Sequence, residues 1–290
     1  MNKQLIIYFK LLRAKQYVKN LFVFAPMFFV FNFSVNNILN STITFFLFCA
    51  TASAVYIFND LYDLEEDAIH PVKQKRPIVA GLIGKRVAIF FIVILVLKSL
   101  IFSLIFNLNV FFILVSYIAL NILYNLIFKR IPVLDVIVIA FGFVLRILGG
   151  CYATDTIPSH WIILMTFLLA IFLGFSKRKG DVMLKESGHS IRLSASYYSL
   201  RTLNTIIYAI TILLSVAYFA YTISPEVKVR LDSPYVFITS IFVIAGLLRY
   251  LQVQKKKGGD ANPTDLVLSD GWLQIIVLLW IASFIVIKFS

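Results

Sequence analysis

Five of the fourteen acidic residues of this 290-residue chain fall within eight consecutive positions, 60–67. Asp60, Asp63 and Asp67 are spaced by three and four residues, so on a helix they would share one face. Asn59 lies one turn before Asp63 and would add an amide oxygen to that face. Like charges stacked in this way destabilise a helix, so the pattern predicts that positive charge compensates them.

Two kinds of positive charge could compensate these acids. One is a divalent cation, because Mg²⁺ takes oxygen ligands and commonly binds one or two carboxylates together with substrate phosphates. The other is ion pairing with the basic segment 73–76 that follows. We favour the metal, since simple pairing does not need three aligned aspartates and an asparagine. The predicted Mg²⁺ ligands are Asp60, Asp63 and Asp67.

The basic loop 70–81 follows the acidic cluster. Pro71 and Pro77 fix an extended or turned backbone there, which leaves Lys73 and Arg76 able to reach phosphate oxygens. An arginine can bind a phosphate through two parallel hydrogen bonds, whereas a lysine supplies a point charge. The acidic cluster and this loop together suit a diphosphate bridged by Mg²⁺.

Membrane-spanning helices must position these residues. Hydrophobic residues make up 60% of the chain and charged residues 14%, which excludes an ordinary soluble domain, and two cysteines give no disulfide framework or metal cluster. Long apolar runs without polar alternation predict helices, because backbone groups in lipid must bond within their own segment. We predict one all-α integral membrane domain, 1–290, with nine spans in a bundle, at about 18–34, 41–61, 87–106, 109–128, 133–152, 159–176, 203–223, 234–252 and 272–288.

The basic residues indicate how the spans are oriented. Of the 27 Lys and Arg residues, 22 fall in the N-terminal segment and in the gaps after spans 2, 4, 6 and 8, and three fall on the opposite side. The positive-inside rule then places the N-terminus in the cytoplasm and the C-terminus outside. We expect a multi-pass protein of the inner (plasma) membrane, with a short interfacial helix within 3–16 and the active site facing the cytoplasm. The net charge of +13 suits this topology and anionic lipid, and we expect no nucleic-acid partner.

The gap after the sixth span carries a second charged segment, 176–186. Asp181 is its one well-placed carboxylate and is flanked by cations that include Lys177 and Arg178. Glu186 lies five residues further on, so it would not share a helix face with Asp181. This segment therefore supplies fewer metal ligands than the first one.

The segment NDLYDLEED at 59–67 and the basic loop that ends in RPIVAG at 76–81 resemble the first motif of the UbiA superfamily of intramembrane prenyltransferases. That family has nine helices, and the resemblance covers essentially the whole chain. It implies Mg²⁺-dependent transfer in which a diphosphate leaves and a lipid is one partner. It also implies a UbiA-like arrangement of the bundle.

A branch of the family is indicated by the second charged segment. UbiA-type enzymes that prenylate aromatic acceptors usually carry a second aspartate-rich motif there, and this chain lacks it. The pattern Lys177-Arg178-x-x-Asp181 instead resembles the polyprenyl-phosphate phosphoribosyltransferases, which implies phosphoribosyl diphosphate as donor and a polyprenyl (decaprenyl-like) phosphate as acceptor. The implied catalytic residues are Asp60, Asp63, Asp181 and Arg76. The implied phosphate- or diphosphate-binding residues are Lys19, Asn20, Asn59, Lys73, Arg76, Lys129, Arg130, Arg146, Lys177 and Arg178.

Polar residues inside or beside the spans allow more than one role. Arg146 lies within the fifth span, where an arginine is costly and functional by default. Asp135 is eleven residues away, about 16 Å along one helix, so it is a poor partner, although another helix could supply one. Asp135 could cap its helix or serve the site, and we favour the cap. Asn121 and Asn125 could line the cavity or bond a neighbouring helix, and Asp270 could begin the last span.

The chemistry of phosphoribosyl transfer fits these residues. Cations would stabilise the charge that grows on the leaving diphosphate, and an acceptor that is already an anionic phosphate needs no general base. The alternative is prenyl transfer from a polyprenyl diphosphate to an aromatic or other small acceptor, which the missing second motif disfavours. A transporter is a distant alternative, because transporter sites usually lie near the membrane midplane between internal repeats. A homo-oligomer is compatible with all three.

Overall fold

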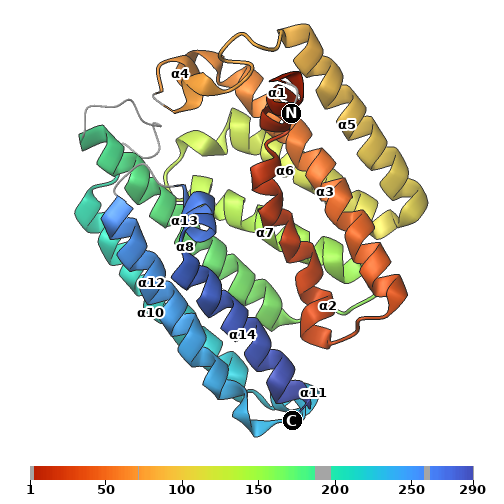
Figure 1. The fold of residues 1–290 in the computed structure, drawn as a ribbon, viewed down its shortest axis with the longest axis vertical. Helices are drawn as coiled ribbons and strands as arrows, with labels where there is room; N and C mark the ends of the chain where they lie inside the picture. Colours follow the sequence, from red (N-terminus) through yellow and green to blue (C-terminus); the bar gives the residue numbers. More distant parts are fainter. Residues whose placement is uncertain (1–2, 71, 187–196, 258–261, 290) are drawn as a thin grey trace. The chain divides into compact units, whose positions relative to one another are not determined.

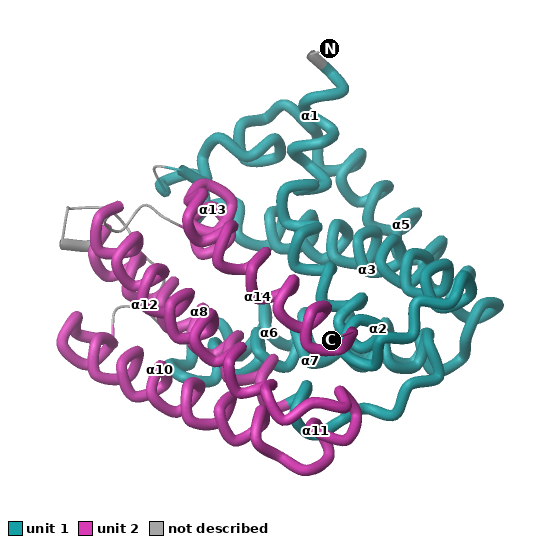
Figure 2. The backbone as a smooth tube through the Cα atoms, turned by 60° about the horizontal axis from the view of Figure 1, so that its bottom comes forward, with its two compact units in different colours: residues 1–163 teal, residues 164–290 magenta. Residues whose placement is uncertain are grey.

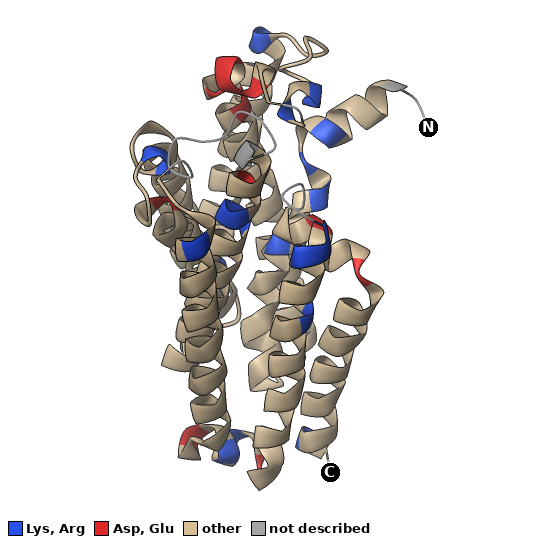
Figure 3. Cartoon of the chain, turned by 90° about the vertical axis from the view of Figure 1, so that its left-hand side faces the viewer, with Lys and Arg blue, Asp and Glu red and all other residues tan. Residues whose placement is uncertain are grey.

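The computed structural model describes residues 3–70, 72–186, 197–257 and 262–289, and all regular structure within these ranges is helical (Figure 1). The chain divides into two compact units, residues 1–163 and residues 164–290 (Figure 2). Lys, Arg, Asp and Glu gather at helix ends and in loops, and the middle stretches of the long helices carry few of them (Figure 3). This distribution is the one expected of helices that cross a membrane.

Unit 1 contains a short N-terminal helix, a long 3₁₀ stretch and four long helices. Its elements are α1 (Lys3–Leu11), η1 (Ala14–Phe24), α2 (Ala25–Val30), α3 (Val35–Tyr62), α4 (Leu64–Ala68), η2 (Lys73–Lys75), α5 (Lys85–Phe106), α6 (Leu108–Leu126), η3 (Phe128–Arg130), α7 (Leu134–Ala153) and the first residues of α8 (His160–Glu186). Helix α1 lies within the segment where the sequence predicts a short helix.

Unit 2 contains the rest of α8 and three further long helices. Its other elements are α10 (Leu200–Ile223), α11 (Pro225–Leu231), η4 (Pro234–Thr239), α12 (Ser240–Lys257), α13 (Pro263–Ser269) and α14 (Gly271–Phe289). Two of the long helices, α10 and α14, begin at a side chain that accepts a hydrogen bond from the first turn. Ser199 Oγ accepts from Thr202 N at 3.0 Å, and Asp270 Oδ1 accepts from Leu273 N at 2.9 Å. The predicted helix-start role of Asp270 is thus confirmed.

Among the residues that the structure describes, eight helical segments are long and apolar enough to cross a membrane, and they correspond to the second to ninth predicted spans. The chain is therefore a multi-pass membrane protein. The predicted first span, 18–34, instead contains the 3₁₀ stretch η1 followed by the short α2, with Pro26 in the first turn of α2. The count of nine spans stays a prediction, as does the orientation.

Two helices form the centre of unit 1. In the apolar windows of α3 and α7, 61% of the residues are buried, whereas the figure for α5 is 11%. The exposed Leu, Ile, Val and Phe residues of α5 therefore suit contact with lipid tails, while α3 and α7 can carry polar groups inside the protein. The candidate site uses both central helices.

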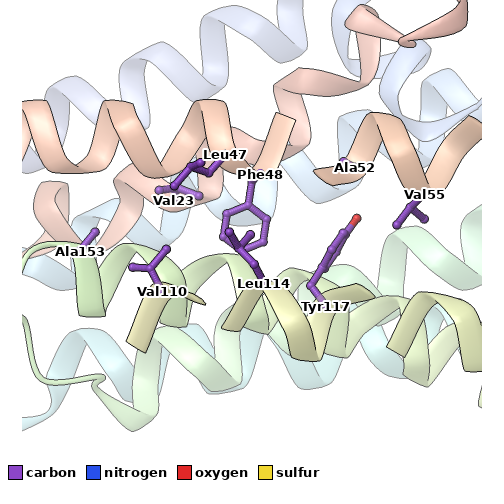
Figure 4. Close-up of a cluster of buried hydrophobic side chains, with 9 residues drawn as sticks. All are labelled: Val23, Leu47, Phe48, Ala52, Val55, Val110, Leu114, Tyr117 and Ala153. Atoms are coloured by element: carbon purple, nitrogen blue, oxygen red, sulfur yellow. The ribbon is translucent and has the colours of Figure 1, made fainter. Parts of the chain in front are cut away.

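A buried apolar cluster packs α3 against α6 and includes Val23 of η1 and Ala153 of α7 (Figure 4). Phe48 of α3 lies against Tyr117 of α6 with ring centroids 5.6 Å apart. Gly149 of α7 lies so close to Phe48 that an added Cβ would fall 2.6 Å from the Phe48 ring. The members of the cluster are Val23, Leu47, Phe48, Ala52, Val55, Val110, Leu114, Tyr117 and Ala153.

Candidate functional site

The aspartate cluster lies where α3 ends, and the helix is interrupted there. Helix α3 ends at Tyr62, Asp63 is its C-cap, and α4 begins at Leu64. The single helix predicted through 59–67 is therefore interrupted at Asp63. Backbone bonds still bridge the break, because Asp63 N donates to Asn59 O at 3.0 Å and Asp67 N donates to Asp63 O at 2.8 Å. The three aspartates thus stay on neighbouring turns.

Asp60 is buried and is paired with two arginines. Its Oδ1 accepts from Arg13 and, at 2.9 Å, from Arg76 Nη1. Arg13 stands between α1 and η1 with a left-handed backbone, φ 52°, and its guanidinium lies 5.0 Å from the centroid of the Tyr56 ring. The N-terminal segment therefore delivers a cation to a carboxylate 47 residues further along the chain.

Asp67 is also buried and is paired with the basic loop. Its Oδ2 accepts from Arg76 Nη1, and its Oδ1 lies 3.0 Å from Lys73 Nζ. Asp60 and Asp67 therefore contact the same nitrogen atom of Arg76. The loop turns after Arg76, where Ala80 N donates to Arg76 O at 2.8 Å and Gly81 adopts a left-handed φ of +70°.

Asp63 is paired with Lys129, which follows α6 in the short helix η3. Both side chains are buried, and Lys129 Nζ lies 4.6 Å from the centroid of the Tyr62 ring. Asn59 accepts a hydrogen bond from Asn125 of α6. The end of α6 thus meets the end of α3, and Asn125 makes the interhelix bond that was one of its two predicted roles.

The structure brings together six of the predicted site residues: Asn59, Asp60, Asp63, Asp67, Lys73 and Arg76, with Lys129 as a seventh. Arg130 is exposed and forms none of the ion pairs that join the described residues. Lys19 lies on η1 and is half-buried. Asn20 and Arg146 bond to each other, away from these ion pairs.

Arg13 belongs to the cluster, although sequence reasoning left it out of the predicted site. Nothing in the spacing of a sequence links residue 13 to residue 60. The available signal was its position among several cations just before the first apolar run, with a glutamine, a tyrosine and an asparagine following it at 16, 17 and 20. A contact of this range follows from packing and not from a local pattern.

The second charged segment lies in unit 2 and forms the last turns of α8, which continue as helix to Glu186. Arg178 is fully buried, and its Nη1 donates to Asp181 Oδ2 at 2.7 Å. Gln254 of α12 donates to Ser176 O at 2.7 Å and fixes this turn against its neighbour. Lys177 lies in the same turn and is partly exposed. Asp181, Lys177 and Arg178 are thus close together within their unit.

The positive charge beside the aspartates comes from Arg and Lys side chains. Within the described ranges, no three His, Cys, Asp or Glu side chains converge as a group that could hold a metal ion. The structure therefore shows ion pairing with basic side chains, which was the less favoured of the two alternatives in the sequence analysis. The donor set nevertheless fits Mg²⁺, because all the candidate ligands are carboxylate or amide oxygens. Two carboxylates already meet at one cationic atom, Arg76 Nη1.

Comparisons with known proteins agree with this architecture. Residues 20–269 match the model of the UbiA prenyltransferase family. The decaprenyl-phosphate phosphoribosyltransferase of Corynebacterium glutamicum is 32% identical over 281 residues, which cover 94% of this chain and 83% of the relative. That of Mycolicibacterium smegmatis is 29% identical over 286 residues, or 94% of this chain and 90% of the relative.

A solved structure shows a similar fold. A UbiA homolog from Archaeoglobus fulgidus, bound to GPP and Mg²⁺, superposes with a TM-score of 0.71. The two chains are 20% identical, and the match covers 98% of this chain and 100% of that one. At this level of identity the likeness concerns the arrangement of the helices.

Proposed function

Because the chain belongs to the UbiA prenyltransferase family and is a membrane transferase, we propose that it moves a 5-phosphoribosyl group from phosphoribosyl diphosphate to a polyprenyl phosphate. The observation that carries this proposal is the pairing of Asp60, Asp63 and Asp67 with four basic side chains from three separate segments. Carboxylates and cations so intermixed suit a metal-bound diphosphate. The relatives named as decaprenyl-phosphate phosphoribosyltransferases support the choice of donor and acceptor.

The proposed reaction needs no proton transfer at the acceptor. An oxygen of the lipid phosphate forms a bond to C1 of the ribosyl group, and the bond from C1 to the diphosphate oxygen breaks. The diphosphate leaves with the electron pair, and Arg76, Lys73, Arg13 and Lys129 would stabilise the charge that it gains. When Mg²⁺ is bound by Asp60, Asp63 and Asp67, it would offset the same charge.

Asp181 and its neighbours form a second part of the proposal. Asp181 would orient the donor or a second cation, and Lys177 and Arg178 would bind phosphate. The hydrogen bond from Arg178 to Asp181 limits the freedom of this carboxylate. The site would face the cytoplasm from the inner membrane, which agrees with the excess of basic residues in alternate segments.

The second candidate is prenyl transfer from a polyprenyl diphosphate to a small acceptor. The structure solved with GPP favours it, because its fold is similar. A second metal would need carboxylates in α8, and the described part of its last turns offers Asp181, which Arg178 already engages. The transporter alternative is set aside, because the family is one of transferases.

The test uses membranes that contain the full chain, with Mg²⁺, labelled phosphoribosyl diphosphate and polyprenyl phosphate. We expect a labelled lipid product that disappears when Asp60→Asn replaces the wild type. A parallel reaction supplies polyprenyl diphosphate and an aromatic acid. Product in this second reaction with none in the first would overturn the proposal and favour prenyl transfer.

A further inference from the structure

Arg146 is a buried cation whose partners are all neutral. It lies in α7 with 4% of its surface exposed. Its Nε donates to Asn20 Oδ1 at 2.7 Å, its Nη1 to Gly142 O at 2.7 Å, and its Nη2 to Tyr117 OH at 2.8 Å. None of the ion pairs among the described residues includes Arg146. Its charge is therefore solvated by dipoles and not by a carboxylate.

Aromatic faces contribute to this solvation. The Arg146 guanidinium lies 4.9 Å from the centroid of Tyr117 and 5.2 Å from that of Phe143. A charge buried among neutral groups is costly, so an arginine kept inside a membrane helix indicates a role. The role implied by the family resemblance, binding of a substrate phosphate, requires access. Asn20 is 1% exposed, and all three guanidinium nitrogens of Arg146 already donate hydrogen bonds.

The contact with Asn20 fixes an unusual element. η1 is an 11-residue 3₁₀ stretch, whereas such helices rarely exceed three or four residues. Hydrogen bonds in 3₁₀ helices have poorer geometry than those in α-helices, so a stretch of this length depends on tertiary contacts for its stability. Asn20 Nδ2 also donates to Cys49 Sγ of α3 at 3.2 Å. Asn20 thus joins η1 to both central helices.

Further contacts continue along η1 towards Asp60. Tyr17 OH lies 2.9 Å from Ser53 Oγ, and Ser53 Oγ donates to Leu12 O at 2.8 Å. The next residue, Arg13, pairs with Asp60. The bonds of Asn20, Tyr17 and Leu12 therefore tie this segment to α3 in steps that end at the candidate site.

The backbone of α7 is shaped to receive η1. A Cβ added to Gly150 would fall 2.1 Å from Val23 O, so only glycine allows the two backbones to approach this closely. Gly150 lies one helical turn beyond Arg146. The glycine and the arginine therefore hold the same stretch of η1, one by contact and the other by a charged hydrogen bond.

We infer that Arg146 is a positioning residue: through Asn20 it holds η1 against α3 and α7, and η1 in turn places Arg13 on Asp60. The effect of Arg146 on catalysis rests on the proposed function, because it requires that Asp60 takes part in the reaction. The effect of Arg146 on the position of η1 does not depend on which reaction is catalysed.

The first test measures whether Cys49, buried beneath Asn20, becomes accessible. In a Cys151→Ala background Cys49 is the remaining cysteine. We expect Arg146→Met and Asn20→Leu to raise the rate of maleimide labelling of Cys49 about tenfold or more, since each removes a buried charge-assisted hydrogen bond. Asn20→Asp keeps an acceptor for Arg146 and should stay protected.

A matched control is Ser99→Ala, which removes the buried hydrogen bond between Thr51 Oγ1 and Ser99 of α5 without touching η1. We expect it to lower thermal stability while Cys49 stays protected. Equal labelling in Ser99→Ala and Arg146→Met would show a general loosening and overturn the positioning role. If Arg146→Met does not fold, the comparison of Asn20→Leu with Asn20→Asp decides the question.

The second test measures coupling between Arg146 and Arg13. If Arg146 acts through η1, Arg146→Met and Arg13→Met both remove the contact between Arg13 and Asp60. The kcat of the double variant should then be close to the kcat of the less active single variant. A fold-loss of kcat in the double variant equal to the product of the two single fold-losses would contradict the inference. Raised KM for either substrate with unchanged Cys49 labelling would make Arg146 a substrate ligand instead. If the protein does not catalyse the proposed reaction, the labelling of Cys49 still tests whether Arg146 holds η1 in place.

Discussion

Burial separates the acidic residues of the segment 60–67 into two groups. Asp60, Asp63 and Asp67 are buried, and each contacts at least one basic side chain. Glu65 and Glu66 are exposed in the same short segment. Five acids of similar sequence context therefore divide into three that face the site and two that face solvent.

Asp60→Asn should lower turnover about 100-fold or more, because it removes a charge from the point where donor and metal would meet. Glu65→Gln is the matched control, since it changes an exposed acid of the same segment, and it should retain most activity. The measurement is initial rate in membranes at saturating substrates. Equal losses in both variants would show that net charge, and not position, controls the activity.

Lys129→Met should destabilise unit 1 by about 3–5 kcal/mol, because it leaves the buried Asp63 carboxylate without its partner. The double variant Lys129→Met, Asp63→Asn should recover much of that loss, since neither buried charge remains. Thermal unfolding of the purified protein in detergent would measure both. A double variant less stable than Lys129→Met would contradict the pairing.

At the scale of elements, the long helices follow from the sequence and the connections between them do not. Apolar runs of sufficient length predicted the eight helical segments that could cross the membrane in the described part of the chain. The first run was predicted in the same way, but η1 carries Tyr17 and Asn20, whose polar contacts with α3 and α7 compete with regular α-helical geometry. The composition of a run shows how apolar it is, but it cannot predict these contacts with α3 and α7.

In the candidate site, too, contacts between residues close in the sequence were predictable and contacts between distant residues were not. Pairing of Asp67 with Lys73 and Arg76 joins residues at most nine positions apart, and the sequence offered it as one of two alternatives. The contacts of Arg13 with Asp60 and of Lys129 with Asp63 span 47 and 66 residues. Only the packing of η1 and α6 on α3 determines them.

Helices α12 and α14 of unit 2 are joined by a pair that predicts a pH dependence. Arg249 donates to Asp270 through Nε at 3.1 Å and through Nη2 at 2.7 Å. The hydrogen bonds from Arg249 are the main cause that lowers the pKa of Asp270. Because the folded pKa is depressed, this stabilisation is present above the ordinary aspartate pKa, about 4, and is lost as pH falls through the lowered value.

Asp270→Asn should therefore unfold at a lower temperature than wild type at neutral pH. The difference should shrink as the pH falls below about 4, because the wild-type carboxylate is then protonated as well. Thermal unfolding across this range would measure the effect. Arg249→Met should show the same convergence, and a constant difference at every pH would contradict the pairing.

For the whole molecule, the segment before α3 decides whether the chain crosses the membrane eight or nine times. η1 and α2 contain 11 and 6 residues. A 3₁₀ helix rises about 2.0 Å per residue and an α-helix about 1.5 Å, so together they extend about 31 Å, close to the thickness of the hydrocarbon core. The 3₁₀ geometry thus lets 17 residues span a distance that would need about 20 in an α-helix.

We expect nine crossings, with the two ends of this segment on opposite sides. Single cysteines at Lys15→Cys and Val35→Cys, both exposed positions, would be labelled with a membrane-impermeant maleimide in intact cells. Labelling should occur at position 35 and require permeabilisation at position 15. Labelling of both positions from one side would reduce the count to eight.

The shared atom between Asp60 and Asp67 has a thermodynamic consequence for how ligands arrive. Arg76 Nη1 contacts both carboxylates, and Arg13 and Lys73 each add a contact to one of them, so both acids already have counterions before a ligand arrives. A bare cation would have to expel the guanidinium, and a bare diphosphate would have to compete with the carboxylates. If both enter together, each takes the counterion that the other releases. Donor and metal should therefore strengthen each other's affinity by the same factor, as linkage requires.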